Sequence, residues 1–267
     1  MDPRLNIVEE RLKGIKRLIV VSGGKGGIGK SSVASALALM LSKSGYKVGL
    51  LDLDFWGPSV HLILGIEEVF PKEERGIVPP QVYGIKFMSI IYYTADKPSP
   101  LRGVDVSNAI IELLAVTQWG SLDFLVIDMP PGIGDATLDV IRLMKRVEFL
   151  VVTTQSRVTL ETVKKILRML KELKVPILGI IENMKITNSP SMRDQLKTFG
   201  VSFLGEIGFD KDLKSSTGNA NELLKTDFAQ DLGKIVWWHL TKKCVNISNE
   251  VRSLMEELKT GPGGGER

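Results

Sequence analysis

One glycine-rich segment near the N-terminus has the residue types that a protein needs to hold phosphate groups. The segment reads Ser22-Gly23-Gly24-Lys25-Gly26-Gly27-Ile28-Gly29-Lys30-Ser31-Ser32. Its glycines let successive backbone N–H groups turn inward around an anion, and a helix that begins behind the loop adds its positive dipole end. Lys30 and Ser31 complete the Walker A spacing that starts at Gly24. We therefore predict that residues 24–32 bind nucleotide phosphates, with Lys30 on the β- and γ-phosphates and the Ser31 hydroxyl on Mg²⁺.

Carboxylates follow two apolar runs further along the chain. Asp52 and Asp54 come after Val48–Leu51, and Asp128 comes directly after Phe124–Ile127. Open α/β sheets bind ligands at the carboxyl ends of their strands, so these side chains should lie beside the phosphate loop. Asp128 has the position of a Walker B carboxylate, which holds Mg²⁺ through water because the ion gives up its hydration shell reluctantly.

Strands and helices that could position these residues alternate along the sequence. Short β-rich apolar runs recur, with helical patterns between them. The runs are Leu18–Val21, Val48–Leu51, Ile85–Met88, Phe124–Ile127, Phe149–Val152, Ile177–Ile181 and Val201–Leu204. Runs that are apolar at every position are typical of central strands covered on both faces. The pattern predicts an α/β fold, with a mostly parallel twisted sheet and helices on both faces.

The sequence shows no internal boundary. No composition break, long linker or repeat divides residues 18–210. We predict a single P-loop domain over residues 1–258, with an N-terminal helix at Arg4–Lys13 and a long helical C-terminus at Phe228–Leu258. Residues 259–267 include a Gly-Pro-Gly-Gly-Gly run and should form a flexible tail.

A second lysine lies early in the phosphate loop, and with it Lys25–Ser31 resembles the deviant Walker A motif of the MinD, ParA and Mrp family. Two further segments, Asp54–Ser59 and Asp128–Asp135, resemble the switch segments of Mrp-type members. The resemblance covers about residues 16–210. It implies a homodimeric ATP hydrolase that binds ATP or ADP together with Mg²⁺.

The same resemblance implies roles for single residues. Lys25 would act in catalysis with Lys30, reaching across the dimer to the partner's nucleotide as an arginine finger does elsewhere. Asp54 would orient the attacking water, and Asp52 would lie near the Mg²⁺ shell. The expected metal-binding residues are then Ser31, Asp52 and Asp128.

The turn after Ile177–Ile181 bears on which base is bound. Glu182-Asn183-Met184 resembles the adenine-side turn of the family, in which the amide of Asn183 would contact the base. A GTPase would have Asn-Lys-x-Asp there, whereas a methionine follows Asn183 in this chain. Asp210 matches the family's second base-side position, although Gly208 stands where a proline is usual.

The chain departs from the family in its metal chemistry. Iron–sulfur carriers of the Mrp type follow the Glu-Asn-Met turn with a Cys-x-x-Cys pair, but Lys185–Met192 holds no cysteine, and Cys244 is the only one in the chain. Ser189 and Ser191 cannot replace the thiolates that clusters bind. The missing pair favours a metalloenzyme maturation factor similar to the ATPase-type HypB of nickel hydrogenase maturation, with the nickel chaperone HypA as its partner. An iron–sulfur carrier and a MinD-like or ParA-like positioning ATPase stay open as alternatives.

Composition limits the remaining partners. The net charge of +4 comes from 35 basic and 31 acidic residues spread over the chain, so nucleic-acid binding is not expected. Basic residues at 164–174 share their segment with apolar residues at helical spacing, which indicates the solvated face of an amphipathic helix. No apolar run reaches the roughly 18 residues of a spanning helix, and glutamates interrupt the C-terminal stripe, so stable membrane association is not expected. With its single cysteine the chain is predicted to be cytoplasmic, and neither His61 nor His239 is assigned to a metal.

Overall fold

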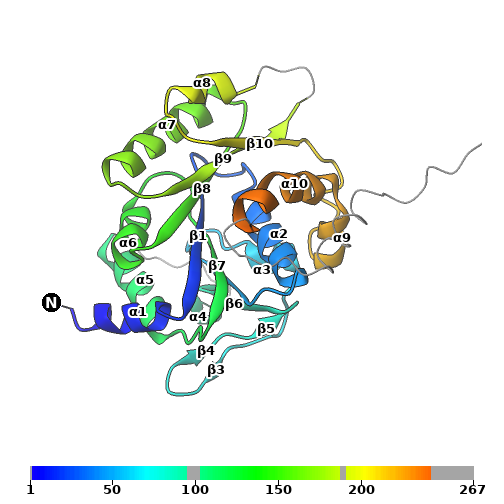
Figure 1. Ribbon diagram of the computed structural model, residues 1–267. Helices are drawn as coiled ribbons and strands as arrows, with labels where there is room; N and C mark the ends of the chain where they lie inside the picture. The colour runs from blue at the N-terminus through cyan, green and yellow to red at the C-terminus, as the bar shows by residue number, and fades with distance from the viewer. Residues whose placement is uncertain (1, 95–102, 187–190, 242–267) are drawn as a thin grey trace, which may run out of the picture.

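The computed structural model of the protein describes residues 2–94, 103–186 and 191–241. An eight-stranded sheet runs through its centre in the order β10-β9-β8-β1-β7-β2-β6-β5 (Figure 1). The strands are β1 (Ile15–Gly23), β2 (Val48–Asp52), β5 (Gln81–Val82), β6 (Ile85–Ser89), β7 (Leu122–Asp128), β8 (Val147–Thr153), β9 (Ile177–Lys185) and β10 (Phe203–Gly208). Neighbouring strands are parallel except β5 and β6, which are antiparallel. A separate antiparallel pair joins β3 (Lys72–Glu73) to β4 (Ile77–Val78).

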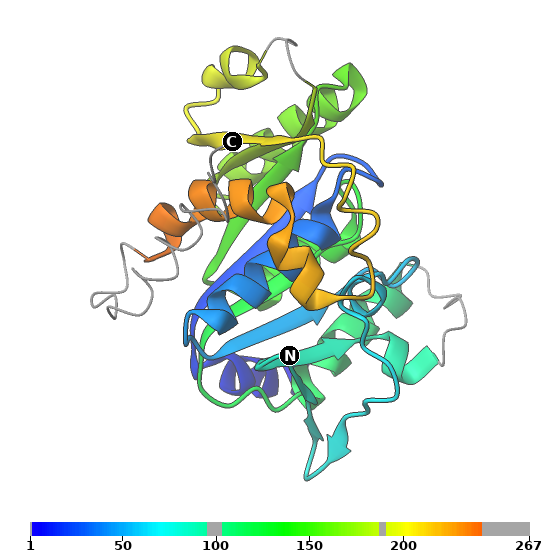
Figure 2. The same ribbon diagram turned by 90° about the vertical axis from the view of Figure 1, so that its right-hand side faces the viewer.

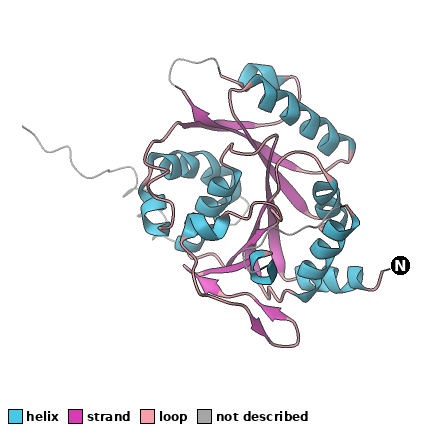
Figure 3. Cartoon of the chain, turned by 180° about the vertical axis from the view of Figure 1, so that it is seen from behind, coloured by secondary structure: helices cyan, strands magenta, loops and turns pink. Residues whose placement is uncertain are grey.

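Helices cover both faces of the sheet, as Figures 1 and 3 show from opposite sides. One face carries α1 (Arg4–Leu12), α5 (Val104–Val116), α6 (Asp135–Leu143), α7 (Arg157–Glu172) and α8 (Arg193–Lys197). The other face carries α2 (Lys30–Lys43), α3 (Val60–Leu64), α9 (Ala220–Lys225) and α10 (Asp227–Thr241), and Figure 2 shows α9 and α10 lying across α2. The short helix α4 (Ile91–Thr94) follows β6. The predicted α/β fold, with a mostly parallel sheet and helices on both faces, is confirmed.

Residues of a single central strand divide between two hydrophobic cores. Along β7, Leu125 packs into the core beneath α1, α5, α6 and α7, whereas Val126 packs into the core beneath α2 and α10. Both side chains are fully buried. A strand that contributes to two cores needs an apolar side chain at every position. This explains why the run Phe124–Ile127 has no polar residue and why it lies in the middle of the sheet, as predicted.

Most of the basic segment at residues 164–174 lies on α7, as its amphipathic pattern predicts, and Lys174 lies beyond the last helical residue, Glu172. Val163, Leu167 and Leu170 are fully buried against the sheet. Arg168 and Lys171, on the opposite side of the helix, are exposed to solvent. The interpretation of these basic residues as a solvated helix face is therefore confirmed.

Element boundaries differ from the predicted ones mainly at the edges of the sheet. Strand β1 begins at Ile15 rather than Leu18, because Ile15 is fully buried and pairs with Leu122 at the start of β7. The strands β3, β4 and β5 were not predicted, since two-residue strands carry no periodicity. The predicted helix beyond α10 and the tail at 259–267 lie outside the described residues. None of the described helices is both long and apolar enough to cross a membrane.

Candidate nucleotide-binding site

The phosphate loop lies between the end of β1 at Gly23 and the start of α2 at Lys30. Gly27 and Gly29 have φ values of 75° and 85°, in the left-handed region that favours glycine. A Cβ atom added to Gly29 would lie 2.3 Å from Nδ2 of Asn183, whereas one added to Gly26 or Gly27 would meet nothing within 4 Å. The loop is thus packed against the protein at Gly29 and open at Gly26 and Gly27. An open stretch of glycine backbone at a helix N-terminus fits the phosphate groups of a nucleotide.

The two lysines of the loop have different environments. Lys30 is buried, and its Nζ donates a hydrogen bond to the backbone oxygen of Lys25 at 3.4 Å. Burial lowers the pKa of Lys30, while the negative charges of Asp128 and Asp54 raise it. The Lys25 side chain is exposed. Lys30 is therefore placed to act within its own site, whereas the exposed Lys25 side chain is not, and its role across a dimer stays a prediction.

Two buried carboxylates lie side by side at the carboxyl ends of neighbouring strands. Asp52 of β2 and Asp128 of β7 are paired in register, and both are fully buried. Burial raises the pKa of Asp128 to about 7, whereas the Ser31 hydroxyl and the Lys30 ammonium lower it. Burial and the charge of Asp128 also raise the pKa of Asp52 well above its ordinary value. Adjacent buried carboxylates repel one another, so this site is complementary to a cation.

Of the two carboxylates, Asp128 is the one whose oxygen atoms have no hydrogen-bond partner among the described residues and could bind an ion. Within the described part of the chain, neither carboxylate oxygen of Asp128 has a partner in hydrogen-bonding geometry, although the Ser31 hydroxyl lies close enough to lower the pKa of Asp128. The oxygens of Asp52 are engaged: Oδ1 accepts from the backbone N–H of Asp54 at 3.0 Å, and Oδ2 accepts from that of Val60 at 3.3 Å. Oxygen atoms are the ligands that Mg²⁺ prefers. Asp128 and the half-buried Ser31 therefore fit the ion. Asp52 holds the segment that follows β2, and because each of its oxygens keeps a further lone pair, its place near the Mg²⁺ shell stays a prediction.

Asp54 shapes the turn after β2. Its Oδ1 accepts hydrogen bonds from the backbone N–H groups of Trp56 at 3.3 Å and Gly57 at 3.1 Å. The residue is half-buried, and its charge acts on both Lys30 and Asp128. Asp54 thus lies beside the phosphate loop, as predicted, and also organises the backbone of the switch segment.

The two residues predicted to contact the base make internal contacts. Asn183 is fully buried, and its Nδ2 donates to the backbone oxygen of Ile28 at 2.9 Å. Asp210 accepts from the backbone N–H of Asp212 at 2.8 Å and from that of Phe228, at the start of α10, at 2.9 Å. Asn183 therefore holds the phosphate loop, and Asp210 caps a helix on the α2 side. The base-reading roles of both residues stay predictions.

The structure thus brings together most of the predicted site residues around one loop. They are Gly24, Lys25, Gly26, Gly27, Ile28, Gly29, Lys30, Ser31, Ser32, Asp52, Asp54, Asp128 and Asn183. Sequence reasoning missed Glu182, a fully buried carboxylate next to Asn183. The signal was present, because Glu182 is a charged residue directly after the apolar run Ile177–Ile181. No group of three or more His, Cys, Asp or Glu side chains suited to a metal occurs in residues 2–94, 103–186 and 191–241.

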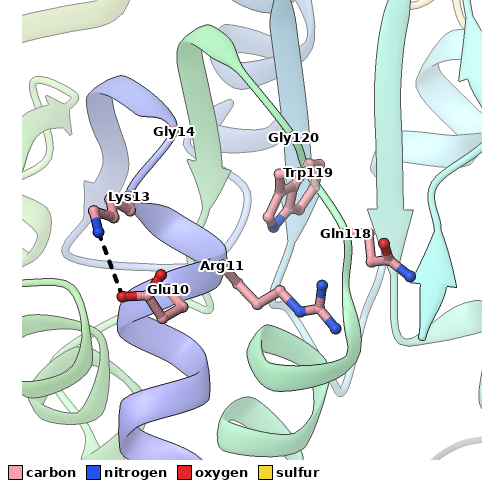
Figure 4. Close-up of a pocket in the computed structure, with 7 residues that line it drawn as sticks. All are labelled: Glu10, Arg11, Lys13, Gly14, Gln118, Trp119 and Gly120. Atoms are coloured by element: carbon pink, nitrogen blue, oxygen red, sulfur yellow. Dashed lines mark ion pairs between the residues drawn. The ribbon is translucent and has the colours of Figure 1, made fainter. Parts of the chain in front are cut away.

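A pocket of about 390 Å³ lies at the opposite edge of the sheet (Figure 4). It is lined by Glu10, Arg11, Lys13, Gly14, Gln118, Trp119 and Gly120. Gly14 directly precedes β1, whereas the phosphate loop follows the carboxyl end of the same strand. Lys13 and Glu10 form an ion pair at 3.6 Å within this group of residues. The pocket has no part in the phosphate site.

Comparison with known sequences matches most of the chain to one family. The ParA family model, described as NUBPL iron-transfer P-loop NTPase, matches residues 14–237. An iron–sulfur cluster carrier protein of Aquifex aeolicus is 41% identical over 77% of this chain, which spans 57% of that relative's length. An iron–sulfur cluster carrier protein of Pyrococcus horikoshii is 36% identical over 99% of this chain and 95% of its own length. The iron–sulfur cluster transfer protein NUBPL of Dictyostelium discoideum is 36% identical over 82% of this chain and 73% of its own length.

Solved structures show the same fold. A nucleotide-binding protein from Archaeoglobus fulgidus, in complex with ADP, is 33% identical and superimposes with a TM-score of 0.69 over 82% of this chain and 92% of its own. The septum site-determining protein MinD of Pyrococcus horikoshii, complexed with Mg-ADP, has a TM-score of 0.64 over 86% of this chain and 96% of its own. At 23% identity, the second comparison supports the fold alone.

Proposed function

The chain belongs to the ParA family of NUBPL iron-transfer P-loop NTPases, and we propose that it is a Mg²⁺-dependent ATP hydrolase that works as a homodimer in iron–sulfur centre maturation. The observation that carries the proposal is the environment of Asp128. This fully buried carboxylate lies beside Lys30 and Ser31, and neither of its oxygens is hydrogen-bonded within the described residues. Such a group is costly to keep in a folded protein unless a cation or its bound water completes it.

Residues of one subunit would hold the nucleotide. The backbone N–H groups of residues 24–30 and the Lys30 ammonium would bind the phosphates. Ser31 and Asp128 would hold Mg²⁺, with Asp128 acting through water. The ion supplies positive charge to the phosphate oxygens. Asp52 would position Asp54 through the hydrogen bond that it accepts from the Asp54 backbone.

Hydrolysis requires an aligned water and a positive charge that stabilises the transferring phosphoryl group. Asp54 would orient the water, since it lies beside the phosphate loop and one of its oxygens, Oδ1, already fixes the switch turn. Lys25 would act on the nucleotide of the partner subunit, because its side chain is exposed and the lysine that faces its own site is Lys30. A dimer would then be needed for turnover, but not for the first binding of ATP.

The similar proteins favour iron–sulfur chemistry over nickel chemistry. The relatives described above are named iron–sulfur cluster carrier or transfer proteins. Nothing in these comparisons supports the expected likeness to HypB, a HypA partner or a role in nickel hydrogenase maturation. The alternative interpretation, a protein of the iron–sulfur carrier family, is the better supported one.

The cysteine content restricts how such a protein could handle a cluster. Cys244, which lies outside the described residues, is the single cysteine, so a homodimer has two thiols. Clusters of the [2Fe–2S] and [4Fe–4S] types usually have four thiolate ligands. We infer that the ATP-driven change of this protein acts on a partner protein that contributes the missing thiolates.

The nucleotide part of the proposal is tested by titration calorimetry with ATP and Mg²⁺ and by phosphate release. The purified chain should bind and slowly hydrolyse ATP. The variant Lys30→Ala should bind no ATP, because the substitution removes the positive charge that the phosphate loop offers to the phosphates. If the wild-type chain binds no ATP, the proposal is wrong.

The cargo part is tested by anaerobic reconstitution with iron and sulfide. The chain alone should show no stoichiometric cluster absorbance, and Cys244→Ser should keep its ATPase activity. A stable cluster that disappears in Cys244→Ser would instead place the protein among self-sufficient carriers.

A further inference from the structure

Strand β9 has, three residues before its end, a buried carboxylate that the nucleotide site does not use. Glu182 is fully buried, and an ionised carboxylate is costly to bury unless hydrogen bonds satisfy it. Its Oε2 accepts from the backbone N–H of Met192 at 2.9 Å, and its Oε1 accepts from Nζ of Lys185 at 3.4 Å. Met192 directly precedes α8. Glu182 therefore fixes the start of that helix.

The next residue makes a corresponding contact on the other face of the sheet. Asn183 donates through Nδ2 to the backbone oxygen of Ile28, inside the phosphate loop, at 2.9 Å. Successive side chains of a strand point to opposite faces. Accordingly, Ile180 packs into the core that contains Met192 and Leu196 of α8, whereas Ile181 packs into the core of α2. Adjacent residues of β9 thus anchor the phosphate loop and α8.

The backbone at this joint has little freedom. Met184, directly after Asn183, has a φ of 57°, in the left-handed region that residues with a side chain rarely adopt. Such a conformation persists only where the surrounding structure fixes it. Glu182 and Asn183, the two residues before Met184, are both buried and hydrogen-bonded, so this part of β9 is held on both faces of the sheet.

We propose that Glu182 is a positioning residue that couples occupation of the phosphate loop to α8. Phosphates bound by the loop act on the segment whose Ile28 oxygen is held by Asn183, and Glu182 carries the change to the N–H of Met192. By linkage, a change at α8 alters nucleotide affinity by the same factor. The coupling rests on the proposed function, because it requires a nucleotide in the loop. It would give a partner protein a helix that reports the nucleotide state.

Hydrogen exchange of the full-length chain, followed by mass spectrometry with and without Mg-ADP, tests this coupling. In the wild type, nucleotide should change the exchange rate of backbone amides in α8, although α8 lies on the other face of the sheet. Glu182→Leu removes the acceptor and should abolish that change, and ADP affinity should shift about five-fold, at the low end of measured couplings. Glu182→Gln keeps an acceptor for the Met192 N–H and should restore most of the response.

Glu206→Gln is the matched control. Glu206 pairs with Lys185 at 3.6 Å, whereas the Met192 N–H donates to Glu182, so this variant should respond like the wild type. If Glu182→Leu does not fold, Met192→Pro removes the donor instead, because the φ of −72° at Met192 suits proline. A wild-type chain that binds ADP without any change in α8, or a Glu182→Leu variant that keeps the full response, would overturn the coupling. If the wild type bound no ADP, the proposed function and the coupling would both be wrong.

Discussion

Asp128 should make Mg²⁺-dependent nucleotide binding sensitive to pH. Its pKa of about 7 means that a large fraction of this carboxyl group is protonated near neutrality when no ion is bound. Since Mg²⁺ requires the carboxylate, nucleotide affinity in Mg²⁺ should rise about ten-fold per pH unit below the pKa and level off above it. Titration calorimetry across this range would measure the slope. Asp128→Asn should flatten the slope, and an equally steep slope in that variant would contradict the assignment.

The Asp128 carboxyl group should make the folded chain less stable as the pH rises, whereas it should make nucleotide binding in Mg²⁺ stronger. A raised pKa means that the folded chain binds the proton more tightly than the unfolded chain does. Its stabilising contribution is therefore complete below the ordinary value of 3.8 and is lost as the pH rises through about 7. Urea unfolding without Mg²⁺ should show this decline, and Asp128→Asn should reduce it. A wild-type chain that becomes more stable over this range would contradict the shift.

Asp54 is predicted to serve hydrolysis and not nucleotide binding. Asp54→Ala should keep ATP affinity within a few-fold but slow phosphate release by about a hundred-fold, as expected for loss of a group that positions the nucleophile. The variant should accumulate as an ATP-bound dimer in size-exclusion chromatography. Glu67→Ala, at an exposed position after α3, is the control. Normal hydrolysis by Asp54→Ala would mean that another group holds the water.

Asn183 shows where sequence reasoning reaches its limit for single residues. The sequence placed it correctly at the end of a strand beside the phosphate loop. Its observed acceptor, the Ile28 oxygen, is 155 positions away, and no local pattern specifies such a pair. For Asp52 and Asp128 the sequence was sufficient to predict that the two side chains lie close together, because the carboxyl ends of parallel strands share one edge of the sheet.

The junction of β1 and α2 should not tolerate a side chain at Gly29. Alanine there would adopt a φ of 85° and place its Cβ 2.3 Å from Nδ2 of Asn183. The left-handed conformation alone costs about 1–2 kcal/mol, and the contact adds to it. Gly29→Ala should therefore lower the melting temperature and weaken ATP binding. Gly26→Ala, which meets no atom within 4 Å, should leave the melting temperature unchanged.

A second substitution separates the effect of the left-handed backbone at position 29 from the effect of the close contact with Asn183. Asn183→Gly in the Gly29→Ala background removes the close contact but leaves the strained backbone. The double variant should be less destabilised than the sum of the two single changes. Additive losses would show that the contact with Asn183 contributes nothing.

Most strands and helices could be predicted from periodicity, and the exceptions have physical reasons. The strands β1, β2, β6, β7, β8 and β9 each contain a predicted apolar run. Strand β10 begins at Phe203 and not at Val201, and Ile207 is its only buried residue, in keeping with its place at the edge of the sheet. The strand order could not be predicted. An apolar pattern indicates that a strand is central, but it does not indicate which strands lie beside it.

The whole molecule is predicted to need a second copy for turnover. Lys25→Ala should keep ATP affinity within a few-fold, while hydrolysis and ATP-induced dimerisation fall, because Lys25 would act on the partner's nucleotide. Light scattering with ATP and phosphate release would measure the two effects. Lys43→Ala, at the exposed end of α2, is the matched control. If turnover by Lys25→Ala is unchanged, the lysine has no role across the dimer.

The place of β1 in the sheet has a consequence for how the protein is made. This strand precedes both of its neighbours, β7 and β8, by a long stretch of chain: Ile15 pairs with Leu122, and Leu18 pairs with Val147. Pairing between strands so distant in sequence is slow, because a long stretch of chain must first be brought together. The phosphate loop at the end of β1 can therefore take its shape only after β8 has been synthesised. ATP would bind late in biogenesis, so that incomplete chains do not compete with finished ones for nucleotide.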